Sequence, residues 1–279
     1  MTTIAICGAG TMGSGIAQVA ATAGYTTILY DLNEEVVQKA RASINKSLQS
    51  QVDKNRISAE RSKEIIGRIH FTSDIRECVA DLIIEAIVEK LAVKISLFNQ
   101  LAQYNRPETI FASNTSSLSL SAIAREISDP SRVAGLHFFN PAPLMKLVEV
   151  VKAEQSSEET ISSLVDLTRK LGKVPVVCRD APGFIVNRVA RPYYIESLRI
   201  AEEGLVDYET IDRLMENQGF KMGPFRLMDL IGNDVNYAVS CSVYDQLGKP
   251  ERLRPSPLQK DKVEKNELGR KTGRGYFNY

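Results

Sequence analysis

The chain has 279 residues, of which 43% are hydrophobic and 25% charged, and its formal net charge is +1. A chain of this length suggests two domains of roughly 150 residues each, and it can bury a substantial core without disulfides or metals. The near-neutral charge excludes an overall field that would favour nucleic acid or an anionic membrane as a partner, so any site for a polyanion must be local.

The four cysteines, Cys7, Cys78, Cys178 and Cys241, are scattered and form no C-x-x-C pair. This pattern predicts reduced thiols in a cytoplasmic protein, and it predicts no metal site. No apolar stretch reaches the length of a membrane span. The N-terminal residues MTTIAICGAG enter a predicted strand at once, so we expect no signal peptide.

Apolar runs alternate with helical segments along the first half of the chain. TIAIC is a short strand ended by glycines, SGIAQVAATAG follows with helical spacing, and YTTILYD is a second strand. Further strands are expected at LIIEAI, TIFAS, RVAGLHF and KLVEVV, and VPVVC is expected to end the sheet. Strands that alternate with helices predict a largely parallel α/β sheet.

The segment from Asn33 to His70 is polar, charged and helical in period. It is too long for an ordinary connection, so it predicts two helices that project from the sheet. After DAPGFIVNR the strand signals largely stop, and the remainder, from about Asn187, predicts mainly helices. The predicted boundary therefore lies near Ile185, between a first domain of residues 1–185 and a smaller all-helical domain of residues 186–279.

The segment CGAGTMGSG places Gly8, Gly10 and Gly13 between a predicted strand and a predicted helix. In a Rossmann-type unit such glycines permit a tight turn and a close approach of a pyrophosphate to the helix N-terminus. Asp31 ends the next strand, where a carboxylate accepts both ribose hydroxyls of NAD and repels the 2′-phosphate of NADP. The alternative is a glycine turn in an unrelated α/β domain, with Asp31 as a helix cap.

The segment HFFNPAPLMKLVEVV brings His137, one of two histidines, to a strand end and Glu149 into the next apolar run. The break at residues 140–143 turns the chain, so the second strand can run beside the first and place Glu149 near the imidazole. A buried carboxylate fixes the tautomer of a histidine and supports its charged form, which suits a general base. A lone histidine is more often structural, but a carboxylate inside an apolar strand favours the pair, because an unpaired buried charge is costly.

The segment FASNTSSLSLS places small polar side chains, Ser113 to Ser117, after a predicted strand and before a predicted helix. Ligands bind at the carboxyl ends of strands in open α/β sheets, so the cluster could contact a ligand. The alternative is a helix N-cap, which needs only one such residue and which the cluster taken alone favours.

Seven stretches, spread over nearly the whole chain, resemble the short-chain L-3-hydroxyacyl-CoA dehydrogenases, close to the bacterial 3-hydroxybutyryl-CoA dehydrogenases. They are GAGTMGSGIAQVAA, EAIVEK, FASNTSSLSL, GLHFFNPAPLMKLVEVV, DAPGFIVNR, MGPF and LGRKTGRGYF. The resemblance implies that His137 is the catalytic base and Glu149 its partner. It also implies that Ser116 and Asn187 contact the reacting oxygen.

The resemblance extends to the binding residues. The expected NAD contacts are Gly8, Ala9, Gly10, Thr11, Met12, Gly13, Asp31, Glu89, Lys94, Ser116, Asn140 and Lys271. The expected contacts of the acyl-CoA substrate are Ser47 and Lys54, on the projecting helices, and Ser116. The helical second domain is expected to complete the substrate site and to form a homodimer.

The implied reaction is the NAD-dependent oxidation of a short-chain (S)-3-hydroxyacyl-CoA, such as 3-hydroxybutyryl-CoA, to the 3-oxoacyl-CoA, and the reverse. Two alternatives are a β-hydroxyacid dehydrogenase acting on a free acid, and a non-enzymatic, crystallin-like relative that keeps NAD binding. A third is a 3-hydroxyadipyl-CoA dehydrogenase of aromatic-acid breakdown, because Arg226 and Asn233 depart from the family pattern. Arg226 would then bind the substrate carboxylate; otherwise it is a surface residue that pairs with an acid such as Asp229.

Overall fold

The computed structural model describes residues 1–279 as two compact units, Met1–Asp180 and Ala181–Tyr279. The units divide after Asp180, and the predicted boundary near Ile185 lies in the turn that follows. That turn packs on the second unit, since a Cβ on Gly183 would lie 2.8 Å from the side chain of Val243.

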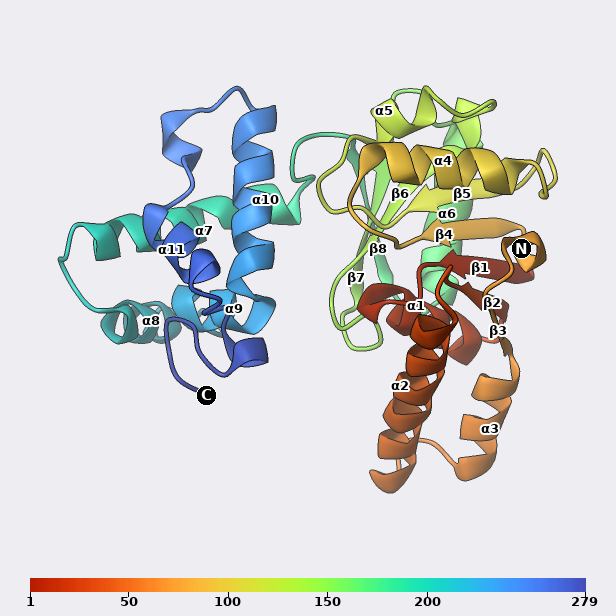
Figure 1. The fold of residues 1–279 in the computed structure, drawn as a ribbon, viewed down its shortest axis with the longest axis horizontal. Coiled ribbons are helices and arrows are strands. Elements are labelled where there is room, and N and C mark those ends of the chain that lie inside the picture. The colour runs from red at the N-terminus through yellow and green to blue at the C-terminus, as the bar shows by residue number, and fades with distance from the viewer. The chain divides into compact units, whose positions relative to one another are not determined.

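An eight-stranded sheet forms the centre of the first unit (Figure 1). Its strands are β1 (Thr3–Cys7), β2 (Thr26–Tyr30), β3 (Ile69–Thr72), β4 (Leu82–Glu85), β5 (Ile110–Ser113), β6 (Val133–Phe138), β7 (Leu147–Lys152) and β8 (Val174–Arg179). Their order is β3-β2-β1-β4-β5-β6-β7-β8, and all neighbours pair in parallel except β6 and β7. The predicted, mostly parallel α/β sheet is confirmed.

Strand β3 is the one strand that the sequence did not predict. His70 lies within it, where β3 pairs with β2 at one edge of the sheet. Only the two ends of this four-residue strand are buried, and the His70 side chain is exposed beside Glu77, with Nε2 2.7 Å from Oε2. The apolar run that identifies a buried strand is therefore missing.

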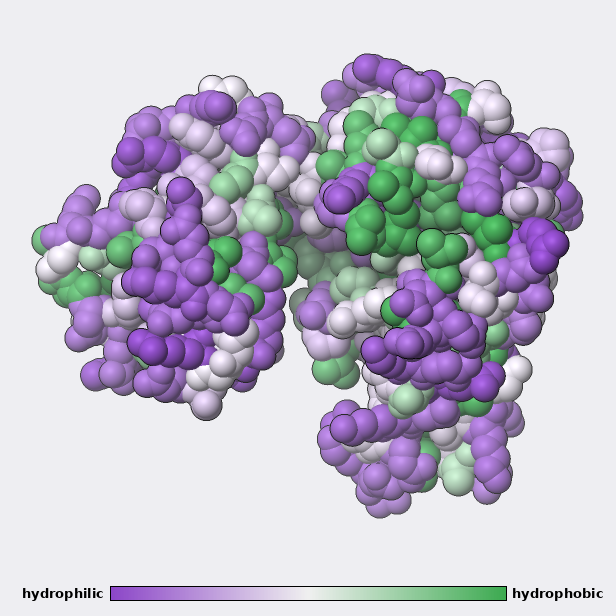
Figure 2. Space-filling view, viewed as in Figure 1, coloured by the Kyte–Doolittle hydropathy of each residue, from purple (hydrophilic) through white to green (hydrophobic).

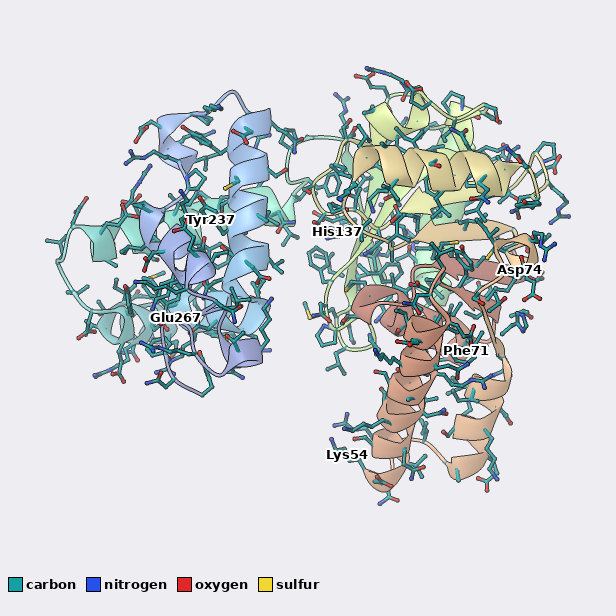
Figure 3. The ribbon with its side chains drawn as sticks, in the orientation of Figure 1. Lys54, Phe71, Asp74, His137, Tyr237 and Glu267 are labelled. Carbon is teal, nitrogen blue, oxygen red and sulfur yellow. The ribbon has the colours of Figure 1, made fainter.

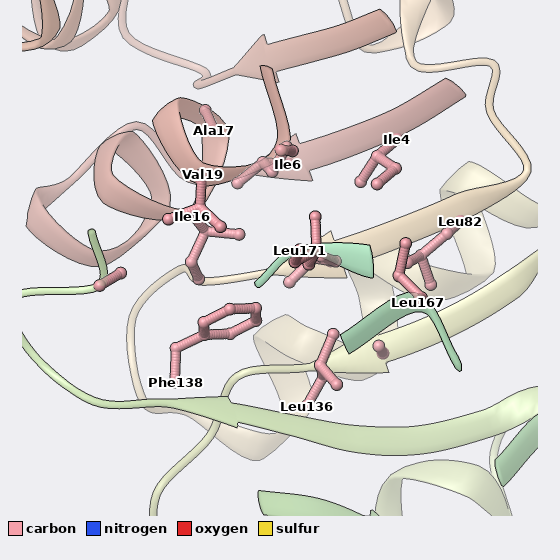
Figure 4. Packing of buried hydrophobic residues seen from close by; sticks show 14 of the residues in the cluster. Ile4, Ile6, Ile16, Ala17, Val19, Leu82, Leu136, Phe138, Leu167 and Leu171 are labelled. Atoms are coloured by element: carbon pink, nitrogen blue, oxygen red, sulfur yellow. The ribbon is translucent and has the colours of Figure 1, made fainter. Parts of the chain in front are cut away.

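The central strands are buried along their whole length. Every residue of β4, β5 and β6 is buried, as is typical of parallel strands covered on both faces. Ile4 and Ile6 alternate along β1 and point to the same face. They join Leu136 of β6 and Leu167 of the helix after β7 in one hydrophobic cluster (Figure 4). This core fixes the strand ends that carry the polar site residues.

The helices of the first unit are α1 (Thr11–Thr22), α2 (Glu34–Asp53), α3 (Ala59–Gly67), α4 (Leu91–Ala102), α5 (Leu120–Ala124) and α6 (Glu158–Lys170), with short 3₁₀ turns at Ile75–Glu77 and Pro130–Arg132. Helices α2 and α3 project from the sheet as an arm with a mainly hydrophilic surface (Figures 1 and 2). Asn33 caps α2 by accepting from the Glu35 amide, and Ser58 caps α3 by accepting from the Arg61 amide. The predicted pair of projecting helices is confirmed.

The second unit is helical, as predicted. Its helices are α7 (Val186–Glu202), α8 (Tyr208–Asn217), α9 (Pro224–Ile231), α10 (Asn233–Gln246) and α11 (Pro257–Glu264), with 3₁₀ turns at Glu251–Leu253 and Arg270–Thr272. Its main core joins Tyr194 and Leu198 of α7 to Phe225 and Met228 of α9, and Tyr276 closes the cluster. None of the helices in the chain combines the length and apolarity needed to span a lipid bilayer.

Candidate active site

The glycine loop between β1 and α1 is a tightly packed turn. Gly8 has φ +105°, and a Cβ there would lie 2.6 Å from the carbonyl oxygen of Ala86. A Cβ on Gly13 would lie 1.7 Å from the carbonyl oxygen of Gly8. In contrast, a Cβ on Gly10 would meet nothing within 4 Å, so the N-terminus of α1 faces open space. The loop can therefore present main-chain N–H groups and the positive end of a helix dipole to a pyrophosphate.

Asp31 joins the glycine loop to the end of β2. Its Oδ2 accepts a hydrogen bond from the Ala9 amide at 2.9 Å, and its Oδ1 accepts from the Asn33 amide at 3.1 Å. The cap of α2 is Asn33, so the alternative of Asp31 as the cap of that helix is wrong. These contacts hold the carboxylate beside the turn, where it can accept hydrogen bonds from the hydroxyls of a bound ribose.

His137 and Glu149 face each other across neighbouring strands. They are register partners on β6 and β7, and Nδ1 of His137 lies 2.7 Å from Oε2 of Glu149. Only 6% of His137 and 1% of Glu149 is exposed. An ionised Glu149 therefore favours the tautomer with the proton on Nδ1, which directs Nε2 away from the carboxylate. Nearby, burial and the charge of Glu149 raise the pKa of Cys178 to about 12, so that thiol stays neutral.

A buried ion pair lies beneath the ends of β4 and β5. Glu85 accepts hydrogen bonds from Lys94 Nζ at 2.5 Å, from Ser113 Oγ at 2.6 Å and from the Ile87 amide at 2.7 Å. Lys94 and Glu85 are 1% and 0% exposed, and Lys94 Nζ also lies 3.1 Å from Oε2 of Glu89. Lys94 was predicted to contact NAD; the structure places its ammonium inside the protein, between two carboxylates.

Glu89 organises the serine cluster. Its Oε1 accepts from Thr115 Oγ1 at 2.5 Å, from Ser117 Oγ at 3.1 Å and from the Ser116 amide at 3.2 Å. Burial opposes ionisation of Glu89, but Lys94 and the hydroxyl donors keep the pKa of its carboxyl below the usual value. The cluster is not a simple cap, because α5 is capped by a later residue, Ser119. The hydrogen bonds to Glu89, which is itself paired with Lys94, therefore fix the loop that carries Ser116.

Asn114 connects this loop to the histidine strand. Its side-chain oxygen accepts from the amide of Phe138 at 2.8 Å, and Phe138 directly follows His137. The main chains after β5 and β6 are therefore tied together at the edge of the sheet where the predicted site residues lie.

The loop after His137 is held from two sides. Lys173 is 8% exposed, and its Nζ donates to the carbonyl oxygens of Ala142 at 2.6 Å and Met145 at 2.8 Å. On the other side, Gly15 of α1 brings its backbone so close that an added Cβ would lie 3.1 Å from the Cβ of Ala142. Asn140, a predicted NAD contact, begins this loop, so its position depends on both contacts.

Two adjoining cavities, of about 390 Å³ and about 610 Å³, lie along α1, α2 and the loop of residues 140–144. Gly10 and Asn140 line the first, Lys54 and Lys170 line the second, and Ser47 lines both. Figure 3 shows Lys54 at the far end of α2, away from the sheet. The predicted substrate residues Ser47 and Lys54 thus border one groove that starts beside the glycine loop.

Comparison with family models decides the classification. The model described as "3-hydroxyacyl-CoA dehydrogenase, NAD binding domain" matches residues 3–181, and that of the C-terminal domain matches residues 183–279. The chain belongs to the 3-hydroxyacyl-CoA dehydrogenase family. This is a family of NAD-dependent oxidoreductases, and the resemblance read from the sequence motifs is confirmed.

Known members of the 3-hydroxyacyl-CoA dehydrogenase family match the whole chain. The 3-hydroxyadipyl-CoA dehydrogenase of Escherichia coli (strain K12) is 48% identical over 99% of this chain, which spans 59% of that protein's length. A probable 3-hydroxybutyryl-CoA dehydrogenase of Deinococcus radiodurans is 41% identical over 98% of this chain and 99% of its own length. The crystal structure of (S)-3-hydroxybutyryl-CoA dehydrogenase from Ralstonia eutropha is 35% identical, with a TM-score of 0.95 over 100% of this chain and 99% of that one.

Two predicted site residues lie in the C-terminal unit. Asn187 is in the first turn of α7, and its carbonyl oxygen accepts from Nε of Arg191 at 3.0 Å. Lys271 Nζ lies 2.6 Å from both carboxylate oxygens of Asp234. Their contacts with substrate and cofactor stay predictions.

Arg226 pairs with a nearby acid, as the alternative reading expected, but the acid is Asp212 and not the suggested Asp229. Nε of Arg226 lies 3.8 Å from Oδ2 of Asp212, and the guanidinium stacks over Phe277 at 4.4 Å. Asp229 instead accepts from Asn233 Nδ2 at 2.8 Å and from the Phe277 amide at 3.0 Å. Asn233 is 0% exposed and its side chain joins the start of α10 to α9. Binding of a substrate carboxylate by Arg226 stays a prediction.

Two residues that shape the site were missed in the sequence. Glu85 interrupts the apolar strand LIIEAI in the same way that Glu149 interrupts KLVEVV, so the same signal could have identified it. Lys173 gives no such signal, because it contacts main-chain carbonyl oxygens, which any residue supplies.

No group of three or more His, Cys, Asp or Glu side chains is placed to hold a metal ion.

Proposed function

We propose that this protein oxidises a short-chain (S)-3-hydroxyacyl-CoA to the 3-oxoacyl-CoA with NAD, and catalyses the reverse reduction. The observation that carries the proposal is the buried His137–Glu149 pair, 2.7 Å apart at the ends of adjacent strands. Two relatives support this class of substrate: a probable 3-hydroxybutyryl-CoA dehydrogenase, matched over 99% of its length, and a 3-hydroxyadipyl-CoA dehydrogenase, matched over 59%.

The residues of the N-terminal unit fit NAD. The open space above Gly10 lies at the start of α1, where main-chain N–H groups can bind the pyrophosphate. Asp31 stands where it can accept hydrogen bonds from the ribose, and its charge disfavours the 2′-phosphate of NADP. When bound, NAD supplies the acceptor for the hydrogen on C3 of the substrate.

The proton on the substrate hydroxyl is the part of the reaction that the protein handles. We assign its removal to Nε2 of His137, since Nδ1 is directed at Glu149. The carboxylate of Glu149 orients the ring and stabilises the imidazolium that forms. Ser116 and Asn187 are assigned to hydrogen-bond the oxygen as it becomes a carbonyl. In the reverse direction the protonated His137 returns the proton.

The groove along α2 is assigned to coenzyme A. Ser47 lines both cavities and Lys54 lines the outer one, in which Arg56 and Lys170 add positive charge suited to phosphate groups. A free 3-hydroxyacid would leave this groove empty, so the groove favours a thioester of coenzyme A as the substrate.

We also assign a homodimer formed through the C-terminal helices. That unit exposes large apolar side chains on α7, on α8 and in the loop after α8, among them Val189 at 72%, Leu214 at 56% and Phe220 at 48%. Such side chains are typical of surfaces that a partner covers. Sedimentation at micromolar concentration tests the dimer, and a monomer would contradict it.

We also assign the protein to a reducing compartment, the cytoplasm, because its four cysteines are unpaired thiols.

The test of the proposed function is NADH oxidation with acetoacetyl-CoA, compared with acetoacetate alone. We expect turnover only with the thioester, because the substrate must use the coenzyme A groove. Turnover of free acetoacetate at a similar kcat/KM would favour a β-hydroxyacid dehydrogenase. NADH binding without turnover of either compound would favour a non-enzymatic relative.

A further inference from the structure

Lys173 is a buried cation in the N-terminal unit that binds one loop of main chain. It is 8% exposed and lies between α6 and β8. Its ammonium has three N–H donors, and they face three carbonyl oxygens: Ala142 at 2.6 Å, Met145 at 2.8 Å and Pro143 at 3.4 Å. All three oxygens belong to the loop of residues 140–145, which joins β6 to β7.

The loop has few donors of its own for these oxygens. Its prolines have no main-chain N–H, and the amides of Leu144 and Met145 both donate to the carbonyl oxygen of Pro141 at 3.0 Å. A carbonyl oxygen shielded from water needs a donor, because leaving it without one costs free energy. Ala142 is 2% exposed, so water replaces its contact with Lys173 least easily.

The main chain of Lys173 is itself anchored. Its amide donates to the carbonyl oxygen of Thr168 in α6 at 3.1 Å, and Gly172, with φ +71°, turns the chain at the end of that helix. The next amide, that of Val174, donates to the carbonyl oxygen of Lys146 at 2.8 Å, where β8 begins beside β7. The ammonium therefore extends from a fixed base, and the loop takes its position from α6 and the sheet.

The loop that Lys173 holds borders both cavities of the N-terminal unit. Ala142 lines the first cavity, Leu144 lines the second, and Pro141 and Pro143 line both. A shift of the loop would therefore alter both cavities at once, whereas the loss of one charged side chain from the second cavity would alter only that one. The first cavity is also lined by four of the expected NAD contacts, Ala9, Gly10, Thr11 and Asn140.

We propose that Lys173 is a positioning residue for both ligands, because it fixes the loop that shapes the NAD cavity and the coenzyme A groove together. This inference rests on the proposed function, which assigns these ligands to the N-terminal unit. Two other roles compete with it. Lys173 also lines the second cavity, so its charge could bind coenzyme A directly, as assigned to Lys170; or its contacts could only stabilise the fold.

The experiment measures two dissociation constants on the full-length protein, that of NADH by fluorescence titration and that of free coenzyme A by calorimetry. Lys173→Met keeps an unbranched side chain but removes all three donors, so the loop should shift. Both constants should then rise by about fivefold or more, the scale of one lost hydrogen bond. Lys173→Arg, which keeps the charge and the N–H donors, should restore much of the affinity for both ligands.

Lys170→Met is the matched control, because Lys170 lines the second cavity but is exposed and lies outside the set of contacts that hold the loop. It should weaken coenzyme A and leave NADH unchanged. If Lys173→Met gave that same pattern, Lys173 would be a direct ligand contact. If it lowered the free energy of unfolding and changed neither constant, its role would be structural alone. Either result would overturn the proposal.

A second variant covers the case in which Lys173→Met does not fold. Lys173→Gln keeps two N–H donors but loses the charge that strengthens them, so both constants should still rise, by about threefold or more. Unchanged constants in this variant, or a rise for coenzyme A alone, would overturn the proposal. A wild-type protein that binds neither NADH nor coenzyme A would instead overturn the proposed function.

Discussion

Buried charges are arranged differently in the two units of this protein. In the N-terminal unit, Lys94 lies between Glu85 and Glu89, and His137 lies against Glu149. In the C-terminal unit, Arg191 is just as buried, but it donates to two carbonyl oxygens and a hydroxyl and lies over the ring of Tyr194. The first arrangement pairs opposite charges, and the second surrounds one charge with neutral groups.

The difference indicates what each unit contributes. A buried ion pair is weak evidence for stability but fixes the position of the groups attached to it, because either partner alone would be a costly buried charge. The paired charges therefore position the base and the serine loop before any ligand binds. Arg191 instead joins α7 to α10, because its acceptors are main-chain and hydroxyl oxygens of these two helices.

The comparison predicts the largest losses where a paired charge acts directly on the substrate. His137→Gln should lower kcat by about 10²–10⁴-fold, because a positioned base is worth that much. Glu149→Gln should also be severe, since the imidazolium would form without its partner. NADH binding, measured by fluorescence titration, should change little in both variants. A loss of only a few-fold in kcat for both variants would show that the His137–Glu149 pair does not carry the proton transfer.

Breaking the buried ion pair of Lys94 and Glu85 should lower the stability of the fold more than it lowers the rate of the reaction. Lys94→Met leaves Glu85 buried without its cation, so the free energy of unfolding should fall by about 3–5 kcal/mol. Denaturant unfolding measures this, and Lys90→Met, at an exposed position just before α4, is the control. Restoring neutrality with Glu85→Gln in the Lys94→Met background should recover part of the loss. An unchanged stability of Lys94→Met would show that the ion pair is not needed to hold this loop.

Asp31 is a partly exposed charge whose protein contacts are main-chain amides, so its removal should be milder. Asp31→Ala should raise KM for NAD by roughly tenfold, the scale of one charge-assisted contact. It should also raise the kcat/KM ratio of NADP to NAD, because the repulsion of the 2′-phosphate is lost. Steady-state kinetics with both cofactors measure this. Efficient use of NADP by the wild type would show that Asp31 does not select the cofactor.

The smallest effect is expected at the exposed end of the arm, where water screens a charge. Lys54→Ala should raise KM for the acyl-CoA a few-fold and leave KM for NADH unchanged, as an exposed ion pair contributes only about 0.2–1 kcal/mol. The effect should shrink at high salt. Lys63→Ala, on the neighbouring helix α3, is the control. Equal changes in both KM values, or in neither, would remove Lys54 from the coenzyme A site.

The sequence was informative where burial leaves a pattern of residue types. Strands covered on both faces are continuous apolar runs, and such runs predicted the buried strands of the sheet. Strand β8 was predicted from its apolar run VPVVC although it is an edge strand and only partly buried. A carboxylate inside such a run must have a partner, which is why Glu149 pointed to His137. Strand β3 was missed because its four residues, IHFT, form no continuous apolar run.

The sequence was uninformative where the contact is to the main chain or comes from tertiary packing. Lys173 and Arg191 donate to carbonyl oxygens, which leave no mark in the residue types around them. The partner of Arg226 was predicted from helical spacing as Asp229, yet α8 supplies Asp212 instead. Spacing along one helix cannot register an acid that packing brings from another.

The most direct test of the account is a double-mutant cycle of His137 and Glu149, because the central claim is that they act as one unit. The measurement is kcat/KM for acetoacetyl-CoA reduction by His137→Gln, Glu149→Gln and the double variant. We predict that the double variant is about as slow as the slower single variant, as expected of residues that share one function. A loss equal to the product of the two single losses would mean that they act independently, and would contradict the account.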